Sequence, residues 1–109
     1  MEWLNQLIGN EGPITIGVTS EKLRDFLTGP DREVELLSSD LETKRYYNYI
    51  ILDHPLDLKK VFRALRNGGY LLFTNFEVES NYLYDLGFST ISQVEGFTIV
   101  KKVHSWNDW

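Results

Sequence analysis

The segment YNYIILDHPLDLKKVFRALRNGGYLLFTN, residues 47–75, carries three successive patterns. Residues 47–53 form a nearly continuous apolar run, which is typical of a strand buried on both faces of a parallel sheet. Four apolar residues then recur at helical spacing before Gly68-Gly69, and they are Leu58, Val61, Phe62 and Leu65. Residues 70–74 are again apolar and rich in strand-forming residues. The segment therefore predicts a strand, a helix and a second strand.

The chain on either side continues the alternation of strands and helices. Before this segment, the patterns predict a helix over 2–9, a strand over 13–18, a helix over about 20–28 and a strand over 34–37. After it, they predict a short helix over 77–86 and strands over 90–94 and 97–103. Glu95-Gly96 separates the last two strands, which is typical of a hairpin. The expected fold class is α/β, with a sheet that is parallel except at one edge.

Length and composition limit the class of protein. The 109 residues contain no linker-like stretch or shift in composition, so we expect a single domain over residues 1–109. The hydrophobic content of 42% is enough for a core. Polar residues interrupt the first apolar positions, and no later apolar run approaches the length of a membrane span. We expect a soluble, cytoplasmic protein with no membrane partner.

The charge pattern argues against general binding of nucleic acid. The formal net charge is −5, whereas binding to phosphates depends on clustered lysine and arginine residues. One local basic group lies on and just after the helix of the central segment, and it consists of Lys59, Lys60, Arg63 and Arg66. These side chains either form the solvated face of the helix or face a phosphate group.

The sequence offers no metal site. It contains no cysteine, which excludes disulfides, thiolate metal sites and cysteine nucleophiles. The two histidines, His54 and His104, have no aspartate or glutamate at ligand spacing. We therefore expect no bound metal.

Residues 47–103 resemble the second half of class I S-adenosylmethionine-dependent methyltransferases. In that family a central strand ends in an acidic or amide residue, and a helix leads to a leucine, a Gly-Gly turn and the next strand. The matching residues here are Asp53, Leu65 and Gly68-Gly69. The resemblance implies a small Rossmann-like, mostly parallel sheet with flanking helices and a C-terminal antiparallel β-hairpin. It also implies strand order 2-1-4-5 in family terms and S-adenosylmethionine as the cofactor.

The same resemblance implies four cofactor-binding residues, which are Gly17, Thr19, Asp40 and Asp53. Asp40 lies 23 residues after Gly17, close to the ~20-residue spacing at which an acidic side chain meets a ribose in dinucleotide-binding folds. The first loop departs from the family pattern, because Val18, Thr19 and Ser20 occupy positions where glycines would let the backbone approach a cofactor. This departure predicts a weak or lost cofactor site.

The chain is also short between Asp40 and the strand at 47–53. The family places a helix, a third strand and another helix in this interval. Two parallel strands at this separation require a crossing of ~20 Å, whereas residues 39–46 would span only ~12 Å as a helix and up to ~26 Å extended. The link is therefore predicted to be mostly extended, and no third strand remains for the adenine side of a pocket.

Asp53, His54 and Pro55 follow the central strand, at the edge where open α/β sheets bind ligands. In the methyltransferase interpretation they would contact the methionine portion of the cofactor or the methyl acceptor. His54 has the residue type of a general base, with an unperturbed pKa of about 6.5. The alternative is that Asp53 and His54 only shape the turn before a helix. They are thus the candidate catalytic residues, without a visible partner in the sequence.

Two functional hypotheses follow from the sequence. The first is a divergent, minimal methyltransferase with a shallow cofactor cleft. The second is a non-catalytic scaffold or protein-interaction subunit built on the same fold, acting through a protein partner or a homo-oligomer. Trp106 and Trp109 bear on the second hypothesis, because these indoles either pack on the sheet or mark a partner surface.

Overall fold

The computed structural model describes residues 2–9 and 12–103. Trp106, Trp109 and His104 lie outside the described residues, so the predictions made for them stay predictions. Four helices and six strands occur in the described chain: α1 (Glu2–Ile8), β1 (Ile14–Val18), α2 (Glu21–Leu27), β2 (Arg32–Leu36), β3 (Tyr47–Leu52), α3 (Leu58–Ala64), β4 (Leu65–Phe73), α4 (Ser80–Leu86), β5 (Phe88–Val94) and β6 (Phe97–Lys102). None of the described helices has the length and apolar character needed to cross a bilayer.

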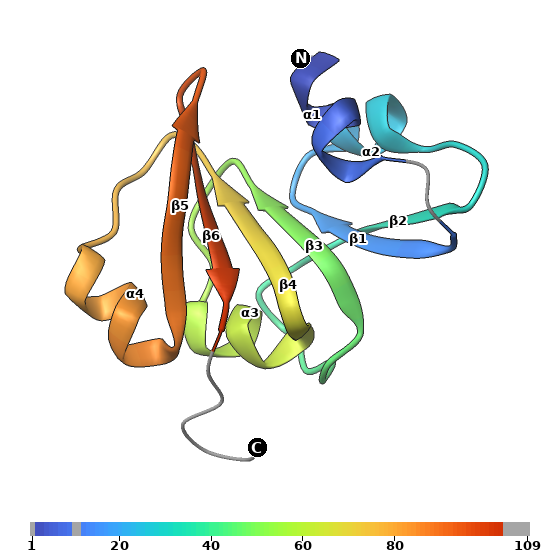
Figure 1. Ribbon diagram of the computed structural model, residues 1–109. Helices are drawn as coiled ribbons and strands as arrows, with labels where there is room; N and C mark the ends of the chain where they lie inside the picture. The colour runs from blue at the N-terminus through green and yellow to red at the C-terminus, as the bar shows by residue number, and fades with distance from the viewer. Residues whose placement is uncertain (1, 10–11, 104–109) are drawn as a thin grey trace.

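The six strands form one sheet in the order β2-β1-β3-β4-β6-β5 (Figure 1). β2, β1, β3 and β4 pair in parallel, while β6 is antiparallel to both β4 and β5. In family terms this is the predicted order 2-1-4-5 followed by the hairpin. The α/β, mostly parallel Rossmann-like sheet with a C-terminal antiparallel hairpin is therefore confirmed.

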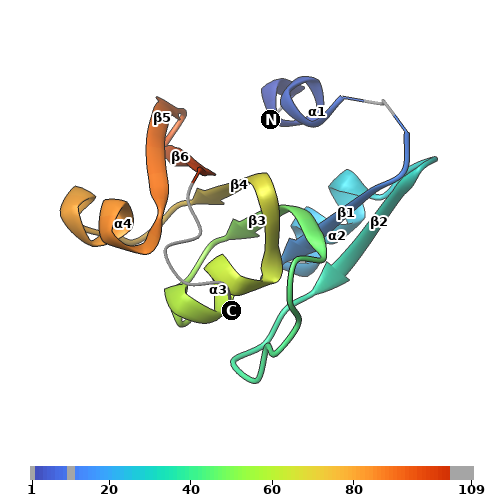
Figure 2. The same ribbon diagram turned by 60° about the horizontal axis from the view of Figure 1, so that its bottom comes forward.

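Helices pack on both faces of the sheet, because successive side chains of a strand point to opposite faces. On β3, Ile50 and Leu52 join a buried cluster with α3 and α4, whereas Ile51 joins a second cluster with α1 and α2. On β4, Leu71 and Leu72 divide in the same way. Figure 2 shows the layers, with α1 on one side of β3 and β4 and α3 on the other. The continuous apolar runs of these strands follow from this two-sided burial.

The helix after β3 ends earlier than its apolar spacing predicts. We expected Leu65 in the helix and Gly68-Gly69 as its end, but α3 stops at Ala64 and Leu65 begins the nine-residue strand β4. Leu65 pairs with Tyr47 of β3, so tertiary pairing overrides helical periodicity here. Gly69 has a packing role within this strand, because a Cβ at Gly69 would lie 2.9 Å from the Arg66 carbonyl oxygen.

The link between β2 and β3 contains turns but no helix or strand, which confirms the prediction that no third strand remains there. It runs beside α3, where the Arg45 and Tyr46 backbone amides donate to the carbonyl oxygens of Arg63 and Ala64, both at 2.8 Å. Leu41 and Tyr47 from this region are buried in the cluster beneath α3. This link therefore takes part in the core on the α3 face.

Candidate functional site

The candidate site lies where β1 and β3 end, at the carboxyl edge of the parallel strands. β1 pairs with β3 through Val18 and Ile51, so the residues that follow the two strands emerge side by side. Thr19 directly follows Val18, and Asp53 directly follows Leu52. Open α/β sheets bind ligands at this edge, where loops diverge and leave polar groups accessible.

Two hydrogen bonds join Thr19 to Asp53. The Thr19 hydroxyl donates to Oδ1 of Asp53 at 2.6 Å, and the Asp53 backbone amide donates to the Thr19 hydroxyl oxygen at 2.9 Å. The Thr19 amide also donates to the Ile51 carbonyl oxygen at 3.3 Å. The threonine thereby fixes the carboxylate at the end of β3, although the two residues are far apart in sequence.

His54 and Asn75 complete this group, which we call the Thr19–Asp53 cluster. Nδ1 of His54 lies 3.0 Å from Oδ1 of Asp53. From the segment after β4, the Asn75 side-chain amide donates to the Asp53 carbonyl oxygen at 3.2 Å. Asn75 has a φ of 71°, a left-handed conformation that asparagine adopts more readily than most residues. The cluster therefore draws on the ends of β1, β3 and β4.

The surroundings of Asp53 favour its ionised form. The hydrogen bond from Thr19 is the largest influence and lowers the pKa of the Asp53 carboxyl below its ordinary value, with His54 acting in the same direction and burial opposing both. The Asp53 side chain is 34% exposed and that of His54 is 57% exposed. The cluster thus presents an accessible carboxylate that can accept hydrogen bonds from a cationic or polar ligand.

Gly17 lies inside β1 and not in the loop that follows it. A Cβ built on Gly17 would be 2.8 Å from a terminal methyl carbon of Leu37, so the leucine side chain occupies the space above this glycine. The Leu37 amide also donates to the Val18 carbonyl oxygen at 2.7 Å. Gly17 therefore permits the close approach of Leu37, and a ligand above Gly17 would have to displace that side chain.

Asp40 lies apart from the Thr19–Asp53 cluster in its contacts. Its carboxylate accepts a hydrogen bond from the Ser38 hydroxyl, which lowers the pKa of the Asp40 carboxyl. Next to Asp40, the Ser39 carbonyl oxygen accepts a hydrogen bond from Nζ of Lys60 on α3 at 3.4 Å. Within residues 12–103, no recorded contact joins Asp40 to Thr19 or Asp53.

The carboxylates of β2 also have partners. The Tyr46 hydroxyl donates to Glu33 at 2.9 Å, and the Tyr47 hydroxyl donates to Glu35 at 2.8 Å. Glu35 is aligned with Gly17 in the sheet register, so it is the strand carboxylate nearest the candidate site on β2. Glu35 therefore has a partner within the sheet, whereas the partners of Asp53 lie at the carboxyl edge.

Sequence reasoning found Thr19 and Asp53 but missed Asn75 and Leu37. An asparagine directly after an apolar strand was a usable signal, because the ends of neighbouring parallel strands share one edge of the sheet. Nothing in the local sequence indicated that Leu37 would cover Gly17. No group of three or more potential metal ligands occurs among the described residues.

No protein-family model and no curated protein matches the sequence. The fold is similar to a putative S-adenosyl-L-methionine-dependent methyltransferase from Methanococcus maripaludis, with a TM-score of 0.59 at 12% identity over 99% of this chain and 85% of that one. It is also similar to the CurJ carbon methyltransferase, with a TM-score of 0.58 at 12% identity over 92% of this chain and 51% of that one.

A third similar structure is phosphoethanolamine N-methyltransferase 2 from Haemonchus contortus, in complex with phosphomonomethylethanolamine and S-adenosylhomocysteine. Its TM-score is 0.56 at 15% identity, and the match covers 97% of this chain but only 37% of that one. The chain thus spans well under half of this neighbour and about half of the CurJ enzyme. At such low identities the likeness concerns the fold, and the strand order agrees with it. The chain has the Rossmann-like fold of class I S-adenosylmethionine-dependent methyltransferases.

Proposed function

We propose that this chain is a divergent, minimal S-adenosylmethionine-dependent methyltransferase-like domain in which the cofactor site is weak or lost. One observation carries the proposal, namely the Leu37 side chain that fills the space above Gly17. A cofactor loop works by close approach of the backbone to the ligand, which requires that no side chain stand in the way. Here a side chain of the protein itself takes that place.

The residues present fit only part of the cofactor. Thr19 and Asp53 offer a polar edge that could hold an ammonium group, since the Asp53 carboxylate is ionised and accessible. On the other side, Asp40 is bonded to Ser38 and Glu35 to Tyr47. These internal hydrogen bonds support a weak adenosine side of the site, and we assign no methyl-transfer step to Asp53 or His54.

The test is a titration of the full chain with S-adenosylhomocysteine, followed by calorimetry and NMR. We expect weak or undetectable binding for the natural chain. Leu37→Ala should bind about tenfold more tightly if Leu37 is the obstacle, because the substitution empties the space above Gly17. Leu36→Ala is the matched control and should bind like the natural chain, since Leu36 is 41% exposed on the same segment.

Binding by the natural chain at micromolar strength, about −8 kcal/mol, would contradict the proposal. Equal affinities of the natural chain and of Leu37→Ala for S-adenosylhomocysteine, where both bind measurably, would also contradict the proposal. The NMR shifts also show where the ligand binds. A residual site at the Thr19–Asp53 cluster predicts shift changes at the backbone amides of Thr19 and Asp53.

The second candidate function is a non-catalytic interaction subunit, for which we propose a second copy of this chain as the partner. β5 is the edge strand next to β6, and its sequence FSTISQV contains no charged residue. Ile91 on this strand is 54% exposed, and Tyr84 on the adjoining α4 is 59% exposed. Uncharged edge strands pair readily with other strands, and antiparallel pairing of two β5 strands would join two identical, uncharged edges.

A further inference from the structure

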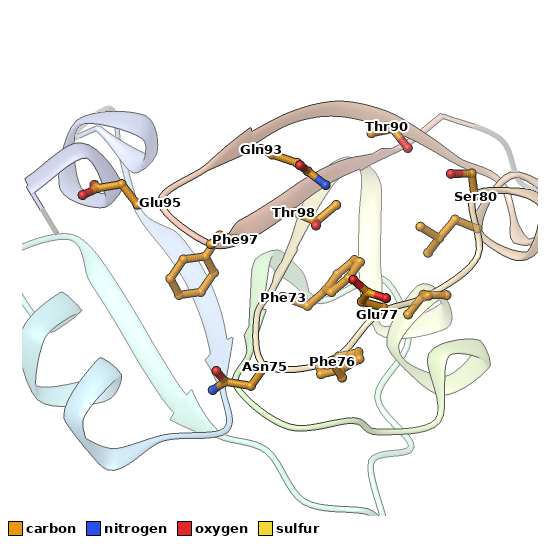
Figure 3. A pocket seen from close by; sticks show the side chains of 13 residues that line it. Phe73, Asn75, Phe76, Glu77, Ser80, Thr90, Gln93, Glu95, Phe97 and Thr98 are labelled. Atoms are coloured by element: carbon orange, nitrogen blue, oxygen red, sulfur yellow. The ribbon is translucent and has the colours of Figure 1, made fainter.

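A cavity lies beside the Thr19–Asp53 cluster, between the β5–β6 hairpin, the start of α4 and the segment that follows β4 (Figure 3). Its volume is about 640 Å³, within the ~300–1,000 Å³ typical of small-molecule sites. Neither Thr19 nor Asp53 lines it. Asn75 is the shared residue, because it lines the cavity and donates to the Asp53 carbonyl oxygen.

The floor of this cavity is aromatic and well fixed. The rings of Phe73 and Phe76 stack with centroids 5.1 Å apart and an interplanar angle of 22°. Phe73 and Phe97 are almost completely buried, while Phe76 is half-buried and keeps part of its ring accessible. Leu83 of α4 closes the apolar side. A ligand with an apolar body would therefore meet aromatic carbon chiefly at the accessible part of the Phe76 ring.

The polar lining contains one carboxylate that faces the cavity, among neutral groups. Glu77 lies among the aromatic residues in Figure 3, whereas the side chain of Glu95 points away from the cavity at the hairpin turn. The Glu77 side chain is exposed, and no hydrogen bond or ion pair is recorded for it within the described chain. No lysine or arginine lines the cavity. Gln93 and Thr98 add neutral hydrogen-bonding groups along the hairpin side.

We propose that this cavity binds a small organic cation, such as a primary or methylated amine carried on an apolar body. A cation gains both from a carboxylate and from the negative face of aromatic rings. An anionic ligand would meet Glu77 without any basic partner. The net charge of −5 also favours the approach of cations.

This binding site does not depend on the proposed cofactor site. Its carboxylate and rings come from residues 73–98, and it shares only Asn75 with the Thr19–Asp53 cluster, whose other members follow β1 and β3. Loss of cofactor binding would therefore leave the cavity unchanged. The two sites can be tested separately by titrating each probe alone.

The experiment is an NMR titration of the ¹⁵N-labelled full chain at neutral pH with phenethylamine, which is cationic, and with 2-phenylethanol, its neutral counterpart. We expect shifts at the amides of residues 76–78 and 90–98, and about tenfold tighter binding of the amine. Equal affinities for the two probes would overturn the proposal. So would shifts centred elsewhere, or no shifts at millimolar amine.

Two variants sharpen the test. Glu77→Gln keeps the shape of the side chain and should weaken amine binding about two- to fivefold, without changing the melting temperature or the binding of 2-phenylethanol. Glu79→Gln is the matched control, because Glu79 is exposed two residues away, does not line the cavity and makes no side-chain cap bond to α4. Equal amine affinities for Glu77→Gln and the control would overturn the role of Glu77 and the proposal with it.

Discussion

The Thr19 hydroxyl is the main cause of the lowered pKa of Asp53. Because the pKa of Asp53 in the folded chain is below its unfolded value, the unfolded chain binds more protons between the two values. The stabilising contribution of Asp53 is therefore complete above the unfolded pKa of about 4 and is lost as the pH falls through the folded pKa. Thr19→Val should raise the pKa of Asp53 toward its ordinary value, as ¹³C NMR of the carboxyl group would measure.

The same substitution should also cost about 1 kcal/mol of unfolding free energy at neutral pH, since it removes the hydrogen bonds of the Thr19 hydroxyl. Thr28→Val serves as the control, because the Thr28 hydroxyl donates to the Arg24 carbonyl oxygen, away from Asp53. An unchanged pKa of Asp53 in Thr19→Val would mean that His54 or the backbone sets the ionisation of this carboxyl group.

Gly17 is tested by adding a single methyl group. Gly17→Ala would place its Cβ 2.8 Å from Leu37, and we expect a loss of about 1–3 kcal/mol from overpacking. In a chain that already carries Leu37→Ala, the substitution Gly17→Ala should cost less unfolding free energy than it does in the natural chain. Urea unfolding of the natural chain, the two single variants and the double variant would measure this difference. Additive effects of the two substitutions would show that the leucine moves aside without cost.

At the scale of elements, the sequence placed the correct face of α3 inward. Leu58, Val61 and Phe62 are buried, and so is Leu65 although it belongs to β4. Leu65→Ala should therefore destabilise the chain by about 2–5 kcal/mol. Lys60→Ala should change stability by no more than about 1 kcal/mol, because its ion pair with Glu42 is at the surface. Chemical denaturation measures both, and a small effect at Leu65 would contradict its buried role.

The end of α3 depends on a lysine from another element. Nζ of Lys102 on β6 donates to the carbonyl oxygens of Phe62 and Leu65 at 2.7 and 2.8 Å, and this side chain is buried. Lys102→Met should cost about 1–3 kcal/mol, because two buried carbonyl groups lose their donor. The neighbouring Lys101→Met is the control, since Lys101 lies on the opposite face over the ring of Tyr70. Equal thermal stability of the two variants would refute this capping role.

At the scale of the whole molecule, the uncharged β5 edge predicts self-association. If two copies pair through β5, the natural chain should sediment as a dimer at high concentration. Ile91→Lys should make it a monomer with unchanged circular dichroism, because a lysine on an edge strand disfavours pairing. Gln6→Lys, which adds the same charge at an exposed position on α1, should leave the dimer intact. A natural chain that stays monomeric would remove the support for this interaction surface.

Features that depend on residues close in sequence were predicted, whereas contacts between residues far apart in sequence were not. The two-sided burial of β3 and β4 was visible in their continuous apolar runs, because burial on both faces leaves no polar alternation. The end of α3 could not be predicted from the sequence, because Leu65 fits a helical apolar stripe as well as it fits the pairing with Tyr47 in the sheet. Thr19 and Asp53 were named from the edge where strands end, but their direct hydrogen bond depends on how β1 lies against β3.

The sequence by itself determined the fold class, the C-terminal hairpin and the absence of a third strand between β2 and β3. These features follow from local patterns of hydrophobicity, turn residues and chain length, which act over a few residues, whereas the order of the strands was predicted from the resemblance to the methyltransferase family. Only the tertiary structure decided that Leu37 covers Gly17, that Asn75 joins Asp53 and that Phe76 and Glu77 share a cavity. Such contacts arise when separate segments meet in the folded chain, and a local pattern indicates at most that a residue follows a strand, not which residue it contacts.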